Sequence, residues 1–365
     1  MDEFITATLA KAFTDVSYTP EITEFYQEVA ADLKEAALAK MKQDSTLTAQ
    51  TAVQAAYAEM GDLEAVVQLM MQGGTDDKFE ELPALQTAKA YQQAFDSQHI
   101  TQVQVTGTGA KVQLVQSATE QLTVTYTQRG FFKGKVAVEQ AAGVVTITLP
   151  DVQPWAFMIP FKNPRQTVEI GVPTMFAGGI NIISHHGVIT SQQLTAPAAT
   201  IMIQNKAGVV ELQTTEVAAI TLRTKSGNLK LTHCQTNELA FDVQSGNLQV
   251  FDVRGQMTLN LKSGNAKLQQ VTGAGTFSVQ SGNLTVNWQQ VLGDVQLTLQ
   301  NGHIKNDLPL DDAFSFDLKS QNGVVKVGRS ATFTVDTLGH QAGYTALNPQ
   351  YQVLGNVRSG HLRVR

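Results

Sequence analysis

The stretch that decides the fold is residues 238–250, which read Glu-Leu-Ala-Phe-Asp-Val-Gln-Ser-Gly-Asn-Leu-Gln-Val. Leu239, Phe241 and Val243 alternate with polar or small residues before the Ser-Gly-Asn step, and Leu248 and Val250 alternate after it. This period of two is typical of a strand that buries one face. Glycine tolerates the positive φ of a tight turn, where other residues are strained. We therefore predict two short strands joined by a turn.

The same turn recurs along the chain at nearly constant spacing. Its four full copies place glycines 19, 18 and 18 residues apart, and degenerate copies extend the series by steps of 19, 20 and 21. A last copy at Gly360 lies 37 residues beyond Gly323, which we interpret as about two further coils. One such unit cannot close a core, but coils stacked about 4.8 Å apart bury a continuous interior. The sequence thus predicts a mainly β protein, a parallel β-helix-like β-solenoid of about 18–21 residues per coil.

The turn residues have a structural explanation without a ligand. Asparagine side chains aligned on successive coils can hydrogen-bond to one another and to turn backbone groups. We therefore favour a scaffold role over a ligand site. The residues assigned this role are Gly208, Ser226, Gly227, Asn228, Ser245, Gly246, Asn247, Ser263, Gly264, Asn265, Ser281, Gly282, Asn283, Gly302, Gly323 and Gly360.

The first part of the chain has a helical pattern instead. Apolar residues spaced three and four apart predict helices at about 4–13, 20–41 and 46–60, with a further short helix from Leu63 to Met71. Gly73-Gly74 breaks this pattern, and residues 82–95 are expected to form one more helix. We predict three regions: a small all-α helical bundle at 1–72, a hinge and linker helix at 73–98, and the solenoid at 99–365.

The stretch from about Thr101 to Arg365 resembles the bacterial adhesin family labelled domain of unknown function 4097. The matching features are the strand Val168-Glu169-Ile170-Gly171-Val172-Pro173 and the serial Ser-Gly-Asn turns. The resemblance implies a β-solenoid linked to the cell envelope, with some relatives acting in envelope-stress responses to membrane-active peptides. It implies no catalytic residues.

The motifs of common enzyme classes are missing from the sequence. It contains no Walker loop, nucleophile elbow or zinc helix. Cys234 is the only cysteine, and its neighbour His233 is expected to point to the opposite face of a strand. His303 and His361 occupy the asparagine slot of the turn, which we interpret as turn decoration rather than a metal site. We expect no cofactor and no metal.

Polysaccharide-processing enzymes can use β-helices with acidic clusters, so carboxylates are candidate catalysts. The candidates are too scattered in sequence to support that class: Glu238, Asp242, Asp252 and Asp294. We therefore predict that the chain is not an enzyme.

Charge divides the chain into two parts. Residues 1–97 hold 17 acidic and 6 basic residues, net -11, whereas the remainder holds 15 and 20, net +5. This division argues against nucleic-acid binding by the whole protein. The start is acidic, and no apolar run reaches the roughly 20 residues of a membrane span. We expect a cytoplasmic location, or a peripheral one at the cell envelope.

Two segments are candidates for an interaction surface. Residues 150–173 contain five prolines and an apolar run, which would either cap the solenoid or bind, and a basic turn near residue 130 carries two phenylalanines. We predict a non-enzymatic binding protein whose partner is a protein or an anionic envelope polymer or membrane surface. The alternative is a regulatory protein whose helical module contacts a signalling partner. The candidate contact residues are Arg129, Phe131, Phe132, Lys133, Lys135, Trp155, Phe157 and Phe161.

Overall fold

The computed structural model describes residues 1–14, 16, 20–44, 46–58, 63–64, 67, 90–129, 135–151 and 165–365. The chain divides into two compact units, one that contains the helices and one that comprises residues 92–126, 136–149 and 167–365. Each has a hydrophobic core of its own. The Gly73-Gly74 break lies outside the described residues, and the bounds of the three predicted regions stay predictions.

Three helices form the first unit, as the apolar spacing predicts: α1 (Asp2–Leu9), α2 (Pro20–Gln43) and α3 (Ala49–Ala58). Phe13 and Tyr26 meet edge to face with ring centroids 5.1 Å apart, and Leu33 and Val53 are fully buried in the same core. The Thr48 side chain accepts a hydrogen bond from the Thr51 amide (3.2 Å), which caps α3. None of the helices described is long and apolar enough to span a bilayer.

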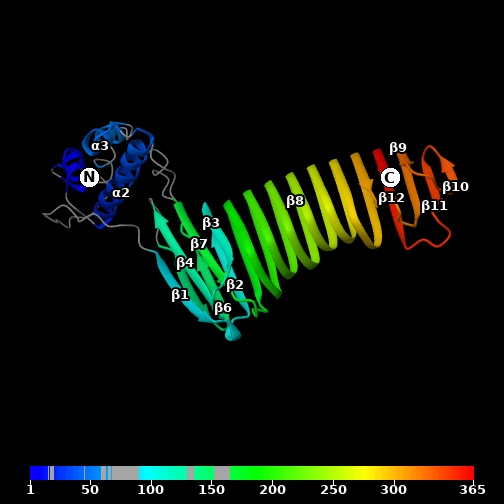
Figure 1. The fold of residues 1–365 in the computed structure, drawn as a ribbon, viewed down its shortest axis with the longest axis horizontal. Helices are drawn as coiled ribbons and strands as arrows, with labels where there is room; N and C mark the ends of the chain where they lie inside the picture. Colours follow the sequence, from blue (N-terminus) through cyan, green and yellow to red (C-terminus); the bar gives the residue numbers. More distant parts are fainter. Residues whose placement is uncertain are drawn as a thin grey trace. The chain divides into compact units, whose positions relative to one another are not determined.

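The second unit is the predicted solenoid (Figure 1). Its main element is β8 (Gly179–Asp307), which pairs with itself coil upon coil. The first coil is covered by β2 (Gln102–Gly107) and β3 (Ala110–Gln116), both parallel to β8, with Val105 opposite Ile182 and Val112 opposite Ile189. The preceding strands are β1 (Tyr91–Asp96), β2 (Gln102–Gly107), β3 (Ala110–Gln116), β4 (Gln121–Arg129), β5 (Ala137–Ala141), β6 (Val144–Thr148) and β7 (Arg165–Val172).

Alternating residues fill the interior of the coils in rows. One row consists of the residues five positions before the turn glycines. The side chains of this row are at most 1% exposed to solvent, because the coils on both sides cover each of them. This is the continuous core that the sequence predicts. Its members in β8 are Ile182, Ile203, Leu222, Phe241, Leu259, Phe277 and Leu297.

The end of the solenoid departs from the order of the sequence. The strand β12 (Tyr351–Val364) is parallel to β8 on one side, with His361 opposite His303, and to β9 (Phe314–Val327) on the other, with Gly360 opposite Gly323. The expectation of two further coils beyond Gly323 is therefore wrong. The final strand instead lies between the Gly302 and Gly323 coils, where it appears in red in Figure 1.

A hairpin closes this end of the stack. The strands β10 (Thr332–Thr337) and β11 (His340–Tyr344) are antiparallel, and β11 also pairs antiparallel with β9. The hairpin therefore covers the outer edge of β9, an edge that would otherwise present unpaired backbone groups to other chains.

The helix expected at residues 82–95 is wrong in its last five residues, since Tyr91–Asp96 form β1, which pairs with β4. Gln and Ala in this segment favour a helix weakly, but pairing in a sheet and burial of Phe95 outweigh that preference. Residues 82–89 lie outside the described part of the chain.

Candidate binding surface

Glycines of successive coils stack into a single column. A Cβ added at Gly246 would collide with the Gly227 carbonyl oxygen, and the same relation links each neighbouring pair. The order in space is Ala110, Gly187, Gly208, Gly227, Gly246, Gly264, Gly282, Gly302, Gly360 and Gly323. Sequence reasoning missed Gly187, although it lies 21 residues before Gly208 and follows the same spacing.

Serine and asparagine of the full turn copies point outward and are exposed. The amide of Asn247 donates to the side-chain oxygen of Asn228 (3.2 Å), and Asn283 donates in the same way to Asn265 (3.0 Å). The hydrogen bonding predicted between turns is thus present at these two steps, where it links neighbouring coils.

Two histidines continue the asparagine row. His303 and His361 stack with ring centroids 5.1 Å apart and an interplanar angle of 18°. They are brought together only because β12 inserts beside the Gly302 coil. Within the described residues, no group of three or more His, Cys, Asp or Glu side chains is placed to hold a metal ion.

Charged residues are sorted around the glycine column. We define the turn ridge as the residues from four before to three after the column glycines from Gly208 to Gly360. Residues 179–365 hold 14 Lys and Arg, of which 11 lie on this ridge, and 11 Asp and Glu, of which only Glu211 and Asp242 do. The ridge is therefore basic, although the whole segment is nearly neutral. Its basic residues are Lys206, Arg223, Lys225, Lys230, Lys262, Lys267, Lys305, Lys319, Lys326, Arg358 and Arg363.

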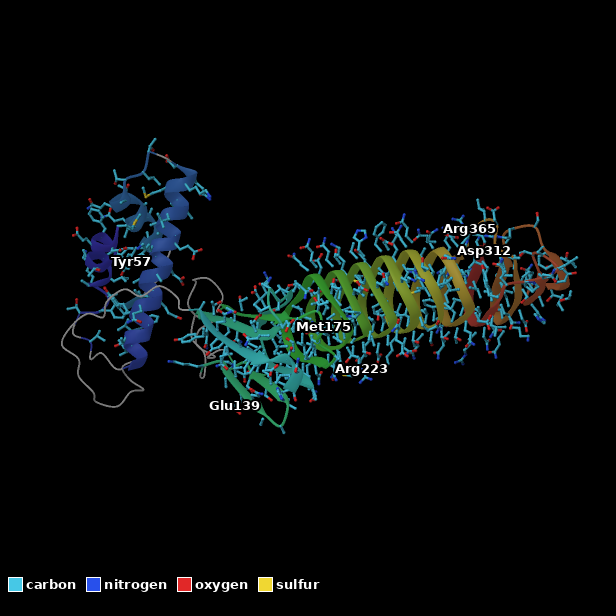
Figure 2. All side chains as sticks on the ribbon, turned by 60° about the horizontal axis from the view of Figure 1, so that its bottom comes forward. Tyr57, Glu139, Met175, Arg223, Asp312 and Arg365 are labelled. Atoms are coloured by element: carbon cyan, nitrogen blue, oxygen red, sulfur yellow. The ribbon has the colours of Figure 1, made fainter. Side chains whose placement is uncertain are left out.

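Most of these basic groups have no carboxylate partner. Lys230 pairs with Glu211, Lys305 with Asp307 and Lys319 with Asp317. The other eight form no ion pair with any residue in the described ranges, and all eight are exposed. Arg223 is labelled among the side chains that project outward from the coils in Figure 2. The arrangement leaves a row of free positive charges, one or two per coil in most coils.

A second corner of the coil is also built from repeated positions. Gln193, Thr214, His233, Asp252 and Gln270 all have φ between 49° and 54°, and they lie 21, 19, 19 and 18 residues apart. The left-handed conformation redirects the chain, so that the residue after each of them is buried: Leu194, Thr215, Cys234, Val253 and Val271. The sequence did not predict this corner, because none of the five is glycine and only His233 and Asp252 are of the other types enriched at positive φ.

Cys234 and His233 point to opposite faces, as predicted, because the thiol is buried and the imidazole is exposed. Burial raises the pKa of the Cys234 thiol, so the thiolate that a nucleophile requires is disfavoured. His233 Nδ1 instead meets Asp252 Oδ2 of the next coil at 2.7 Å. The pair therefore links two coils and does not activate the cysteine.

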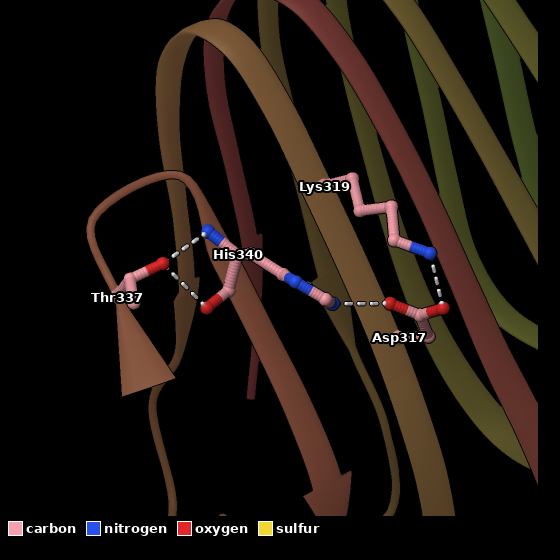
Figure 3. A network of polar contacts seen from close by, with 4 residues as sticks. All are labelled: Asp317, Lys319, Thr337 and His340. Carbon is pink, nitrogen blue, oxygen red and sulfur yellow. Dashed lines mark hydrogen bonds and ion pairs between the residues drawn. The ribbon is translucent and has the colours of Figure 1, made fainter. Parts of the chain in front are cut away.

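The closing hairpin is attached to the solenoid by a polar network (Figure 3). Asp317 on β9 meets Lys319 Nζ at 2.7 Å and His340 Nε2 at 2.8 Å, and the His340 amide donates to the Thr337 hydroxyl at 3.1 Å. The hydrogen bond from Lys319 outweighs burial, and with help from His340 it lowers the pKa of the Asp317 carboxyl. These contacts hold β11 against β9 and have a structural role.

The other predicted contact residues are mostly not described. Phe131, Phe132, Lys133, Trp155, Phe157 and Phe161 lie outside the described residues, and so does the side chain of Arg129. Lys135 is exposed. The choice between capping and binding for residues 150–173 stays open.

A stack of parallel coils with a glycine column and a closing hairpin defines the larger unit as a β-solenoid. The chain belongs to the Toastrack DUF4097 family, whose model matches residues 100–364. This confirms the resemblance inferred from the Ser-Gly-Asn turns and the strand at residues 168–173.

Several solved structures are similar over most of their length. A "putative adhesin" from Bacteroides fragilis has a TM-score of 0.39 and 12% identity, over 76% of this chain and 98% of the other. A "putative adhesin" from Parabacteroides distasonis has a TM-score of 0.36 and 11% identity, over 76% and 98%. A "putative cell adhesion protein" from Clostridium sporogenes has a TM-score of 0.23 and 10% identity, over 76% and 99%. No curated protein matches the chain.

Proposed function

We propose that the chain is a non-enzymatic, adhesin-like binding protein of the cell envelope that holds an anionic polymer along its turn ridge. The observation that carries this proposal is the sorting of charge, with 11 of 14 basic but only 2 of 11 acidic residues of the segment on the ridge. A scaffold needs no such sorting for stability, because like charges on neighbouring coils repel one another. A ligand with regularly spaced negative charges would offset that repulsion.

The spacing of the ridge suits a long ligand. Successive coils lie about 4.8 Å apart, so the basic side chains lie along one strip of surface, to which every ridge coil except those of Gly246 and Gly282 contributes. Exposed lysines bind such a ligand through many weak contacts rather than one tight pocket. The proposal therefore predicts avid binding of polymers and weak binding of the corresponding single units.

The test compares two double variants of the full chain that change net charge equally. Lys225→Gln with Lys262→Gln removes two exposed ridge charges, and Lys11→Gln with Lys42→Gln removes two exposed charges from the helical unit. Binding of poly-L-glutamate and polyphosphate is measured at low and physiological salt. We expect the ridge variant to bind about tenfold more weakly at low salt, since two contacts of about 0.7 kcal/mol each are lost. The control variant should bind as well as the unaltered protein.

A third variant separates the ridge from the basic turn near residue 130. If Arg129→Gln with Lys135→Gln weakens binding and the ridge variant does not, the contact lies at that turn and the ridge assignment is wrong. Absence of polymer binding by the unaltered protein at low salt would reject the proposed function.

A further inference from the structure

A polar groove opens at the corner built from left-handed residues. This corner repeats regularly up to Gln270, but the next coil is two residues longer, with 20 residues between Gly282 and Gly302 instead of 18. None of the described residues 288–290 has positive φ at the corresponding place. A hollow of about 720 Å³ lies here, lined by side chains from four successive coils.

The groove wall is rich in hydrogen-bonding groups and carries no net charge. Arg254 and Asp252 offset each other, while Gln235, Gln289 and Gln290 supply amides and Thr272 a hydroxyl. Planar amide, carboxylate and guanidinium groups can each make two hydrogen bonds in one plane. Such a lining matches a ligand that presents many neutral donors and acceptors.

An aromatic ring lies beside the groove. Phe251 is 39% exposed, and its ring meets that of His233 edge to face, with centroids 5.8 Å apart. His233 is in turn held by the carboxylate of Asp252 at 2.7 Å. Through its contact with His233, which lines the groove, Phe251 places an exposed aromatic ring next to the polar wall, a combination that suits the C–H faces and hydroxyl edges of a sugar ring.

Other classes of ligand fit this groove less well. An extended peptide binds by adding a strand to an open sheet edge, but the groove lies in the middle of β8, where coils pair on both sides. An anion would require surplus positive charge, which lies on the turn ridge instead. The Cys234 thiol, whose pKa is raised by burial, gives the groove no nucleophile.

We propose that the groove formed by His233, Gln235, Asp252, Arg254, Gln289 and Gln290 is a binding site for a short neutral oligosaccharide. Three steps of about 4.8 Å between coils give a length of roughly 14 Å, so the ligand is a chain of sugars rather than a single one. The groove is separate from the turn ridge proposed to bind an anionic polymer. The two proposals share only the premise that the solenoid is a binding scaffold.

The test uses the full chain and linear neutral tetrasaccharides of glucose, mannose and N-acetylglucosamine, titrated by calorimetry. Gln289→Ala and Arg254→Gln each remove hydrogen-bonding groups from the groove. The matched control is Gln213→Ala. Gln213 is exposed and lies beside Thr214, at the same corner of an earlier coil that does not line the groove. We expect at least one tetrasaccharide to bind, and each groove variant to weaken it about fivefold or more. The control should leave binding unchanged.

A second measurement reports on the place of binding. The buried Trp288 precedes Gln289 and donates to Asn306 Oδ1 at 2.8 Å, so a ligand in the groove should change its fluorescence in a Trp155→Phe background. No binding by any tetrasaccharide, or binding that both groove variants leave intact, would overturn the proposal. The proposal would also be overturned if the protein bound a neutral Ser- and Gln-rich peptide instead and the groove variants weakened that binding.

The ridge variants keep the two proposals distinguishable. Lys225→Gln with Lys262→Gln should weaken polyglutamate binding and leave tetrasaccharide binding unchanged. Loss of both ligands in the ridge variant would contradict the separation of the two sites.

Discussion

At the scale of single residues, a turn glycine combines a positive φ with close approach of the neighbouring coil, and substitutions at different glycines can separate these two effects. Gly246 has a φ of 139°, and a Cβ there would also meet the Gly227 carbonyl oxygen of the neighbouring coil. Gly109 has a φ of 71° but open space around it. Gly179 has neither positive φ nor a close neighbour, since its nearest atom, Thr200 Oγ1, lies at 3.5 Å.

Alanine at these three positions should therefore destabilise the protein in a graded way. We expect almost no change in the free energy of unfolding for Gly179→Ala, and about 1 kcal/mol for Gly109→Ala from backbone strain alone. For Gly246→Ala we expect about 2–4 kcal/mol, because the collision adds to the strain. Chemical unfolding measures all three. Equal losses for Gly109→Ala and Gly246→Ala would show that close coil contact does not matter.

At the scale of elements, β12 is held at both ends by residues distant in sequence. The Tyr351 hydroxyl donates to Asp312 Oδ2 at 2.7 Å, and at the other end Arg365 and Lys305 both bind Asp307. Burial alone would raise the pKa of the Asp307 carboxyl, but the hydrogen bonds from Arg365 and Lys305 outweigh it and lower the pKa. The strand β12 is thus held by ion pairs as well as by backbone hydrogen bonds to β8 and β9.

This pKa shift predicts how the contribution of Asp307 to folding stability depends on pH. A carboxyl whose folded pKa lies below its unfolded value of about 3.9 stabilises the fold above that value, and loses the contribution as pH falls through the folded pKa. Asp307→Asn should lower stability by about 1 kcal/mol at pH 7, and by progressively less as the pH falls below the unfolded pKa of about 3.9 and through the folded pKa of Asp307. Thermal unfolding from pH 7 to pH 2.5 gives the comparison. A difference that is the same at every pH would contradict the assigned role.

At the scale of the whole molecule, residues 1–89 carry a net charge of -10 and residues 90–365 carry +4, a surplus that depends on Arg129, Lys133, Lys135, Lys162 and Arg165. The strand β1 begins at Tyr91 and pairs with β4, so a fragment that keeps this strand should start at residue 90. We expect residues 90–365 to bind anionic liposomes more strongly than the full chain, because the repelling acidic unit is removed. The difference should shrink between low and physiological salt as exposed charges are screened over about 8–10 Å.

Co-sedimentation at the two salt concentrations tests this expectation. Circular dichroism first establishes that the fragment keeps its β structure. Equal sedimentation of fragment and full chain at low salt would mean that the acidic unit does not oppose binding.

The sequence by itself determined the repeating coil, its buried rows and the outward asparagines. These features follow from the alternation of apolar residues and from the need for glycine at a turn of positive φ, as at Gly246. Both causes act between residues close together in the chain. It also contained the basic ridge, since Lys225 and Lys262 each lie two residues before a turn glycine, but the pattern becomes visible only once the glycines are stacked.

The order of the last coils was decided by tertiary structure alone. Coils with the same alternating apolar face can pair in more than one order, and no local rule selects among them. In the structure β12 pairs with β8 on one side and β9 on the other, so Gly355 lies opposite Leu297 and Leu318 in the buried row. A Cβ at Gly355 would collide with the Leu318 side chain of β9 and with Leu362 of β12 itself. This pairing of residues distant in sequence also brings His303 to His361. The groove also depends on tertiary structure, because its lining residues come from four successive coils that only the stacking brings together.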